Sequence, residues 1–499
     1  MCLEQYVLDF NAADREYYQS DIDNAHALEW MQAEIPLLEC PDTEIERAYY
    51  FRWWVYRKHI KKTPEGSMIT EFLPTVPWSG KYNLINAAAG HHIMEGRWLK
   101  HAEQYLVDYI RFFLNNRQEG MRYSSWLIWA AKEFHKVTGG LNLPNFLKKA
   151  VPYYHAWETE RKTECGLFWS VDNRDAMEFS ISGTKNGTAT KGIRPTLNSY
   201  MYGDAAAIYE LSVQYGKPLE EFRIKAEKIR QRMWALLWRD GFFKAAHPAH
   251  ESFSHVKDMA SAEIPKELIG YIPWYFGMPE QGHENVFLFL EDPKIFGTEF
   301  GITTAEQGHP AFLYDAEHEC LWNGYIWPFA TSQTLTALIW AAEADRDVYG
   351  GLFCRLLRQY ARQHTRTVQD GEKIMWIDEV KAPYEDLWSS REILKNWNWP
   401  KEKGGYERGK DYNHSTFCDL VITGLAGVRI VNETVLFRPI LPKTWQYFCL
   451  DHLYIQGDIY RIEYDKTGEK YSRRGWTVYR NGVIVPAGCV CATEADIRR

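Results

Sequence analysis

The segment 161–198 gathers acidic side chains at a spacing that suits proton transfer. Asp172, Asp175 and Glu178 lie within seven residues, and Arg194 follows in the same segment. A carboxyl group in an aromatic-lined cleft loses hydration, which raises its pKa and suits it to act as a general acid. The same acids could instead accept hydrogen bonds at a helix N-terminus or pair with an arginine, so both interpretations stay open for each of them.

A second acidic pair, Asp378 and Glu379, lies in the segment 365–413, after Trp376 and before Pro383. A carboxylate on a rigid turn flanked by an aromatic ring can accept a proton from water. A solvated acidic turn on the surface is the alternative interpretation. Two acids on separate loops that face one cleft are what glycoside hydrolysis needs, because one protonates the departing oxygen and the other activates the nucleophile.

Aromatic residues accompany these acids at a high frequency, with 21 Trp among 499 residues. Some of these rings belong to the core, but flat rings also stack on ligands, most commonly sugars. The stretch ECLWNGYIWPFATSQ places Trp322, Asn323 and Trp327 at the mouth of an apolar helix. Trp rings pack against the C–H face of a pyranose, while amides and imidazoles bind its hydroxyls. We predict these substrate-binding residues: Trp78, Lys81, Tyr82, Asn83, His92, Arg194, His309, Trp322, Asn323, Trp327, Tyr412 and His414.

The adjacent residues His91 and His92 could indicate a metal site. Neighbouring side chains on a helix, however, point about 100° apart and cannot share one ion. His91 and Glu95 are one turn apart, without an HExxH motif or a third ligand nearby. The chain also has no GxSxG, no GxGxxG after a strand and no P-loop. We therefore expect neither a metal nor a cofactor.

The elements that position these side chains are mostly helical. About twelve segments have helical periodicity and plausible ends. They lie near 41–60, 84–98, 101–115, 123–138, 144–160, 199–215, 219–238, 259–276, 284–291, 327–345, 349–364 and 414–427. Six helical hairpins predict a mainly α fold, an (α/α)6 barrel whose long loops build a cleft at one end.

After about residue 430 the pattern changes to alternation with period two, which predicts strands. The segment YRNGVIV contains an Asn-Gly hairpin signal. We therefore predict a barrel domain over 1–430 and a small β-strand region over 431–499, packed on the barrel.

The composition excludes several classes of partner. The net charge is −8, so nothing attracts a nucleic-acid backbone. No apolar run reaches the ~18 residues needed to span a bilayer, and no signal peptide is visible at the start of the chain. Nine Cys show no regular spacing, and the close pair Cys489 and Cys491 lies near the tail, where we expect disorder rather than a metal. We expect a cytoplasmic protein without membrane partners, and the oligomeric state stays open.

Several stretches resemble the six-hairpin glycosidases of the (α/α)6 class, which include glycoside hydrolase family 63, the trehalases and glycoside hydrolase family 142. NRDAMEFSISG resembles the loop that carries the general acid in family 63, and DEVKAP resembles the loop that carries the general base. CLWNGYIWPFATSQTL resembles the stretch that lines the sugar site. RPTLNSYMYGDAAAI and DYNHSTFCDLVITGL are most similar to family 142.

This resemblance implies an inverting, exo-acting glycoside hydrolase for a small oligosaccharide or glycoside, with Asp175 as general acid and Glu379 as general base. Asp172, Glu178 or Asp378 could replace one of the two. The sugar and the anomeric configuration of the bond stay open.

Two rival interpretations remain. A sugar epimerase or isomerase on the same fold would use histidines as acid and base, which would give importance to His91, His92, His309 and His414. A non-catalytic glycan-binding protein would keep the aromatic cleft without turnover.

Overall fold

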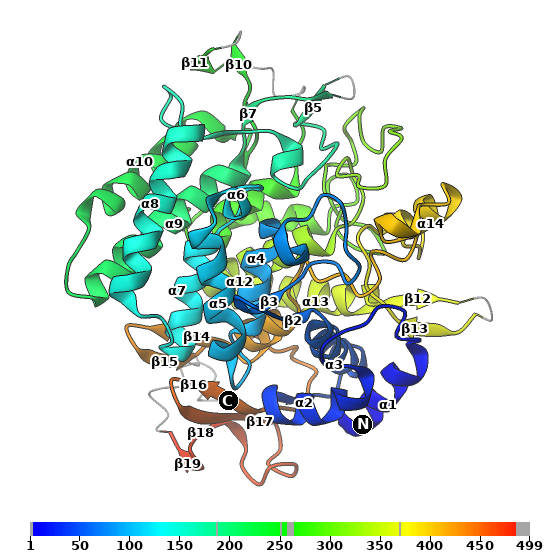
Figure 1. Cartoon of the computed structure of the whole chain (residues 1–499). Helices are drawn as coiled ribbons and strands as arrows, with labels where there is room; N and C mark the ends of the chain where they lie inside the picture. Colours follow the sequence, from blue (N-terminus) through cyan, green and yellow to red (C-terminus); the bar gives the residue numbers. More distant parts are fainter. Residues whose placement is uncertain (1–2, 186–187, 250–251, 257–263, 369–370, 486–499) are drawn as a thin grey trace.

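A closed ring of helices forms the body of the chain (Figure 1). The computed structural model describes residues 3–185, 188–249, 252–256, 264–368 and 371–485. Each inner helix packs against the next in the order α4, α7, α9, α11, α12, α15, and α15 returns to α4. These helices are α4 (Ala89–Gly96), α7 (Leu127–Thr138), α9 (Pro195–Gln214), α11 (Ile272–Tyr275), α12 (Pro328–Ala344) and α15 (Cys418–Leu420).

An outer layer of helices covers this ring. α5 packs on α4 and α7, α8 and α10 pack on α9, η7 and α13 pack on α12, and α3 packs on α15. Their bounds are α3 (Thr43–Lys58), α5 (Ala102–Asn115), α8 (Leu143–Arg161), α10 (Glu220–Leu237), the 3-10 helix η7 (Glu284–Leu290) and α13 (Gly351–Gln363). The predicted mainly α fold, an (α/α)6 barrel, is confirmed.

The amphipathic pattern of the outer helices explains their position. One stripe of α10 is buried and the rest faces solvent, as expected for a helix that covers a core. The buried stripe consists of Phe222, Ala226, Ile229, Met233 and Leu237. The inner helices α9 and α12 begin with a proline at the first helical position, which loses no intrahelical hydrogen bond there.

Some helices differ from the sequence prediction. The segment 414–427 contains the short α15 followed by a π-turn, Val421–Leu425, and part of the predicted helix 259–276 lies outside the described residues. Three helices were not predicted from the sequence: α1 (Leu3–Ala13), α2 (Ala27–Glu34) and α14 (Ser389–Asn396). In the described part of the chain, every helix is too short or too polar to cross a lipid bilayer.

A five-stranded antiparallel sheet lies at the lower edge of the barrel in Figure 1. Its strands are β1 (Leu37–Glu39), β16 (Tyr447–Ile455), β17 (Asp458–Asp465), β18 (Gly475–Arg480) and β19 (Val483–Ile484), in that order. Asn481 and Gly482 turn between β18 and β19 with φ of 51° and 78°, as a type I′ hairpin requires.

The predicted small β-region is therefore confirmed, although β1 comes from the N-terminal part of the chain. Cys489 and Cys491 lie outside the described residues. We propose that the boundary between the barrel domain and the β-region lies at residues 430/431.

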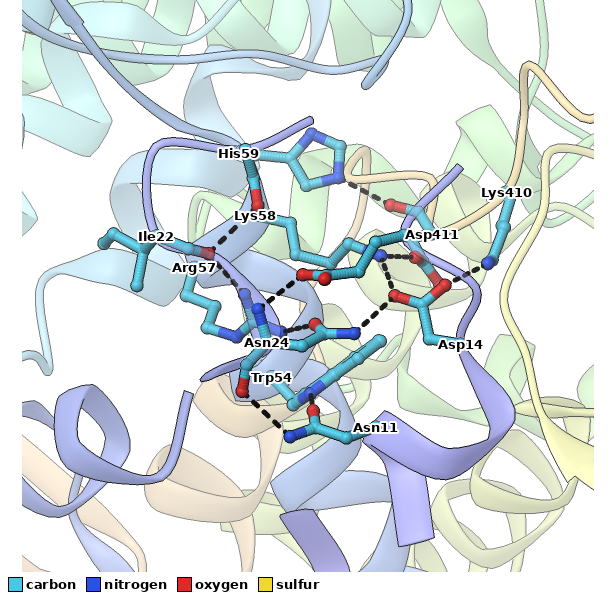
Figure 2. Close-up of polar contacts among 12 residues, drawn as sticks. Asn11, Asp14, Ile22, Asn24, Trp54, Arg57, Lys58, His59, Lys410 and Asp411 are labelled. Atoms are coloured by element: carbon cyan, nitrogen blue, oxygen red, sulfur yellow. Dashed lines mark hydrogen bonds and ion pairs between the residues drawn. The ribbon is translucent and has the colours of Figure 1, made fainter. Parts of the chain in front are cut away.

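The N-terminal segment is tied to a distant loop through buried charges (Figure 2). Asp14 accepts from Lys58 at 2.8 Å and also from Lys410, and Lys58 reaches Asp411 at 2.5 Å. Burial would raise the pKa of Asp14, but the two ammonium groups outweigh burial and lower it. The backbone N–H of Asp411 in turn donates to the carbonyl of Ile377 at 3.0 Å. The start of the chain thus braces the loop that precedes α15.

Candidate active site

Four glutamates from four separate loops interact with one another at one end of the barrel. Glu71 follows β3 (Gly66–Ile69), Glu178 follows a 3-10 turn, Glu319 precedes α12, and Glu379 follows β13 (Lys373–Met375). The charges of Glu319 and Glu178 raise the pKa of Glu379, and the charges of Glu379 and Glu178 raise the pKa of Glu71. The structure therefore brings carboxyl groups from distant parts of the sequence into one cluster.

The segment 319–327 holds two of these loops together. On one side, the N–H of Trp322 donates to the carbonyl of Glu178 at 3.0 Å. On the other side, Ile326 and Lys381 exchange two backbone hydrogen bonds of 3.0 Å each, which fixes the turn that carries Glu379. The Trp-rich stretch therefore positions both carboxyl-bearing loops.

Glu379 lies next to a buried cation. Nη2 of Arg408 contacts Oε2 of Glu379 at 3.1 Å and Oε1 of Glu319 at 2.7 Å. The guanidinium lies between the rings of Trp78 and Trp399, at 4.7 and 5.2 Å from their centroids. Burial raises the pKa of Glu379 to about 8, with Arg408 acting against it and the neighbouring acids adding to it.

Glu178 has a different environment. Its side chain is partly exposed, and its Oε2 accepts from the thiol of Cys320 at 3.0 Å. Loss of hydration raises the pKa of Glu178 to about 7, against the hydrogen bond from that thiol. A carboxyl group of this kind carries a proton close to neutral pH and can donate it.

Glu71 is the third carboxyl group of the cluster with a raised pKa. The hydroxyl of Tyr412 donates to its Oε1, while Oε2 is buried without a hydrogen-bond partner in the structure. Burial raises the pKa of Glu71 to about 8, although the Tyr412 hydrogen bond lowers it and the charges of Glu379 and Glu178 raise it further. The backbone N–H of Asn413 donates to the carbonyl of Glu71 at 3.1 Å, which joins the two loops.

A group of aromatic and imidazole rings adjoins the glutamates. The ring of His414 lies 3.7 Å from that of Tyr412, and Phe329 lies 6.2 Å from His414 and 4.6 Å from His91. Trp322 stacks on Trp327 with 4.4 Å between the ring centroids.

We call this group the ring cluster and define it by His91, Trp322, Trp327, Phe329 and His414. Buried polar atoms in and beside it have no hydrogen-bond partner in the described structure. They are Oε2 of Glu71, both ring nitrogens of His91 and His414, Nε1 of Trp322, Oδ1 of Asn323 and Oγ1 of Thr331. Buried polar groups are nearly always satisfied, so these atoms are available for hydrogen bonds to water or to a polar ligand.

Asp175, the acid expected to donate the proton, is fully engaged inside the protein. Its Oδ2 accepts from Nε of Arg194 at 2.8 Å and from Ser170 at 3.1 Å, and its Oδ1 accepts from Ser124 at 2.6 Å. Its side chain is 1% exposed. Asp175 and Arg194 therefore stabilise the interior of the loop 161–198, which we call the acid loop. Neither side chain presents a free group to the glutamate cluster.

The other two acids are also held by their own loops. Asp172 accepts from Thr184 at 2.6 Å, and Asp378 accepts from the N–H of Glu379 at 2.8 Å and from Ser390 at 3.1 Å.

Lys81, Tyr82 and Asn83 contact their own part of the chain instead of the cluster. Lys81 and Tyr82 reach Glu65, and the amide of Asn83 holds the backbone of the turn before it. These three residues follow Trp78 closely in sequence, but this nearness does not bring their side chains to the glutamate cluster.

Two histidines also have other partners. His92 bonds to the Tyr109 hydroxyl and to the carbonyl of Asn413, and His309 accepts from the N–H of Ala311 at 3.1 Å.

The structure does gather Glu379, Trp78, Trp322, Trp327, Asn323, Tyr412 and His414 in and around the cluster. Four further residues of the cluster were not predicted from the sequence: Glu71, Glu319, Cys320 and Arg408. Their sequence signal is weak, although Glu319 and Cys320 open the Trp-rich stretch and Glu71 lies seven residues before Trp78. In the described ranges, no group of three or more His, Cys, Asp or Glu is arranged to hold a metal ion.

Comparisons with known proteins point to one family. The model of the mannosylglycerate hydrolase MGH1-like glycoside hydrolase domain matches residues 81–415. Among curated proteins, no significant match is found. A solved structure described as a sialidase is 34% identical with a TM-score of 0.83, over 96% of this chain and 43% of that one. The Streptomyces avermitilis alpha-L-rhamnosidase complexed with L-rhamnose shares the fold, at 11% identity and a TM-score of 0.53, over 90% of this chain and 38% of that one. The chain thus spans less than half the length of both.

Proposed function

This chain belongs to the mannosylglycerate hydrolase MGH1-like glycoside hydrolase family, and from that premise we propose that it hydrolyses a glycosidic bond. Glu178 acts as general acid and Glu379 as general base. One observation carries this proposal. Two carboxyl groups with raised pKa values, held on separate loops by one segment, lie beside the ring cluster, where buried polar atoms have no hydrogen-bond partner in the described structure.

The acid is Glu178 rather than Asp175. Donation requires a carboxyl group that holds a proton and is not paired with a cation. Burial raises the pKa of Asp175 against the effect of Arg194, but both of its carboxyl oxygens are held inside the protein by Arg194, Ser124 and Ser170. Glu178 is partly exposed and accepts from the neutral thiol of Cys320.

The reaction is a single displacement with inversion. Glu178 protonates the glycosidic oxygen, and Glu379 removes a proton from a water molecule that attacks the anomeric carbon from the opposite face. This role requires about 6.5–9.5 Å between the carboxyl groups, whereas about 5 Å would favour retention. Contact with Arg408 favours the charged form of Glu379, but burial outweighs this contact and raises the pKa of Glu379 to about 8, above the value of about 7 for Glu178. The reactive form, with Glu178 protonated and Glu379 ionised, is therefore a minor fraction of the enzyme.

The terminal sugar of the substrate binds against the ring cluster, and the enzyme is exo-acting. Burial lowers the pKa of both His91 and His414 far below the usual range, so each imidazole is neutral and offers one donor and one acceptor. Neutral donors and acceptors suit sugar hydroxyls, and the face of Trp322 suits the C–H face of a sugar ring. A small, uncharged glycoside is therefore the favoured substrate class. We also propose a reducing, cytoplasmic setting, which the free thiols of the described cysteines support.

A panel of aryl glycosides that differ in sugar and anomeric configuration tests this function. At least one should be hydrolysed, with product of the inverted configuration appearing first in proton NMR spectra. Glu379→Gln should remove this activity. Conversion of free sugars without bond cleavage, and tolerance of Glu379→Gln, would instead favour the epimerase. Sugar binding without turnover would favour the glycan-binding protein.

A further inference from the structure

One guanidinium nitrogen serves two carboxylates in the glutamate cluster. Nη2 of Arg408 lies 2.7 Å from Glu319 and 3.1 Å from Glu379. Nε and Nη1 of the same side chain are buried without a hydrogen-bond partner in the described structure. Arg408 therefore makes no bidentate contact with Glu379, and its shorter bond goes to Glu319.

Arg408 is held in this geometry. Its side chain is 1% exposed and lies between the rings of Trp78 and Trp399. The neighbouring Gly409 lies against Asp378, since a Cβ on it would come within 2.1 Å of that carboxylate.

Glu379 faces more acids than cations. Glu319 and Cys320 reach it from the segment 319–327, Glu178 from the acid loop, and Asp378 from its own turn. Glu71 and Tyr412 complete the set from the two remaining loops. In the described part of the cluster, Arg408 is the cation that offsets them.

We infer that Glu319 is a positioning residue that sets the ionisation of the general base Glu379, by competing with it for the shared nitrogen of Arg408. This inference rests on the proposed function. Glu319 is the ionised partner of Arg408, since burial would raise the pKa of Glu319 but Arg408, together with His318 at 3.7 Å from its other carboxyl oxygen, lowers it. Its charge repels a second charge on Glu379 and leaves Glu379 the longer contact.

Glu319→Gln is the decisive variant, because it removes this charge and keeps the shape of the side chain. Arg408 is then free to favour charge on Glu379, which loses its proton at lower pH. A like charge this close shifts a carboxyl pKa by about one unit, so the acidic limb of kcat/KM moves down by about one pH unit. Arg408→Gln, which removes the shared donor, moves the titration of Glu379 to higher pH.

The ionisation of Glu379 is measured without substrate, from the infrared band of its protonated carboxyl in difference spectra against Glu379→Gln. This titration decides the inference even if the wild type cleaves no glycoside, a result that would count against the proposed function alone. If Glu319→Gln fails to fold, the upward shift expected for Arg408→Gln provides the test.

Glu343→Gln is the matched control, since Glu343 is shared by Arg429 at 3.1 Å and Arg438 at 2.7 Å, outside the cluster. It should leave the titration of Glu379 unchanged. A titration of Glu379 that stays in place or rises in Glu319→Gln, or stays in place in Arg408→Gln, would overturn the inference.

Discussion

Asp175→Asn and Glu178→Gln separate the two carboxyl groups of the acid loop by what each variant loses. Asp175 is buried and receives hydrogen bonds from Arg194, Ser124 and Ser170. Replacing it with Asn leaves the buried guanidinium of Arg194 without the carboxylate that it contacts. We therefore expect Asp175→Asn to lose mainly stability, and Glu178→Gln to lose mainly activity.

The size of the stability loss follows from this geometry. Removing one partner of a buried ion pair costs about 3–5 kcal/mol. Unfolding entropy is about 2 cal/mol/K per residue, so over 499 residues this cost lowers Tm by roughly 3–5 °C. In the described structure Glu178 forms no ion pair, so Glu178→Gln leaves no buried cation unpaired and should keep Tm within about 1 °C of the wild type.

The activity loss is read from two substrates that share a sugar and differ in leaving group. Loss of a general acid costs about 10²–10⁴-fold when the leaving group needs a proton, and little when it leaves as a stable anion. Glu178→Gln should therefore be slow on an alkyl glycoside and nearly normal on a dinitrophenyl glycoside. Folded Asp175→Asn should retain activity on both.

The opposite pattern would refute the assignment. If Asp175→Asn kept its Tm and lost activity according to the leaving group, while Glu178→Gln kept its activity, Asp175 would be the acid.

Three further predictions concern the general base, the pH profile and the ion pairs of Asp14. Glu379→Gln should lose at least about 10³-fold in kcat on both leaving groups, and equal activity would exclude it as base. The wild-type kcat/KM should peak between about pH 7 and 8, because reaction needs Glu178 protonated and Glu379 ionised; a rate that still rises toward pH 5 would contradict this. Asp14→Asn should cost about 3–5 kcal/mol at neutral pH, measured by denaturant titration. Because folding lowers the pKa of Asp14, this difference from the wild type should narrow as pH falls below about 3.9, and a constant difference would speak against the buried network with Lys58 and Lys410.

Helical periodicity was sufficient to predict the barrel. The buried stripe of α10 can be found in the sequence because local spacing determines which side chains share a face. The missed helices α1 and α14 are short, and their packing depends on distant segments. The residues of the cluster are equally distant, since Tyr412 and Glu71 are 341 positions apart. No local pattern connects such residues.

The acid loop shows why a motif can locate a site and still leave its residues open. Asp175 and Glu178 are three positions apart, and Ala176 and Phe179 have φ of 56° and 60°. Left-handed backbone at non-glycine residues is uncommon, and the sequence gives no sign of it. These two residues redirect the chain, so Asp175 reaches Arg194 while Glu178 reaches Cys320.

The length of the segment 319–327 also affects the stereochemical outcome that the proposed reaction can have. The backbone of Trp322 bonds to Glu178 in the acid loop, and the backbone of Ile326 bonds to Lys381 in the turn that carries Glu379. The length of the chain between Trp322 and Ile326 therefore affects the distance between the two carboxyl-bearing loops. The chain bends at Asn323 and Gly324, so removing one residue should move the two loops relative to each other by at most about 3.3 Å, the length of one extended residue. This shift is comparable to the difference between the carboxyl separations used for inversion and for retention. Deleting a single residue from this span would thus bring the anomeric outcome, rather than the choice of sugar, within reach of protein engineering.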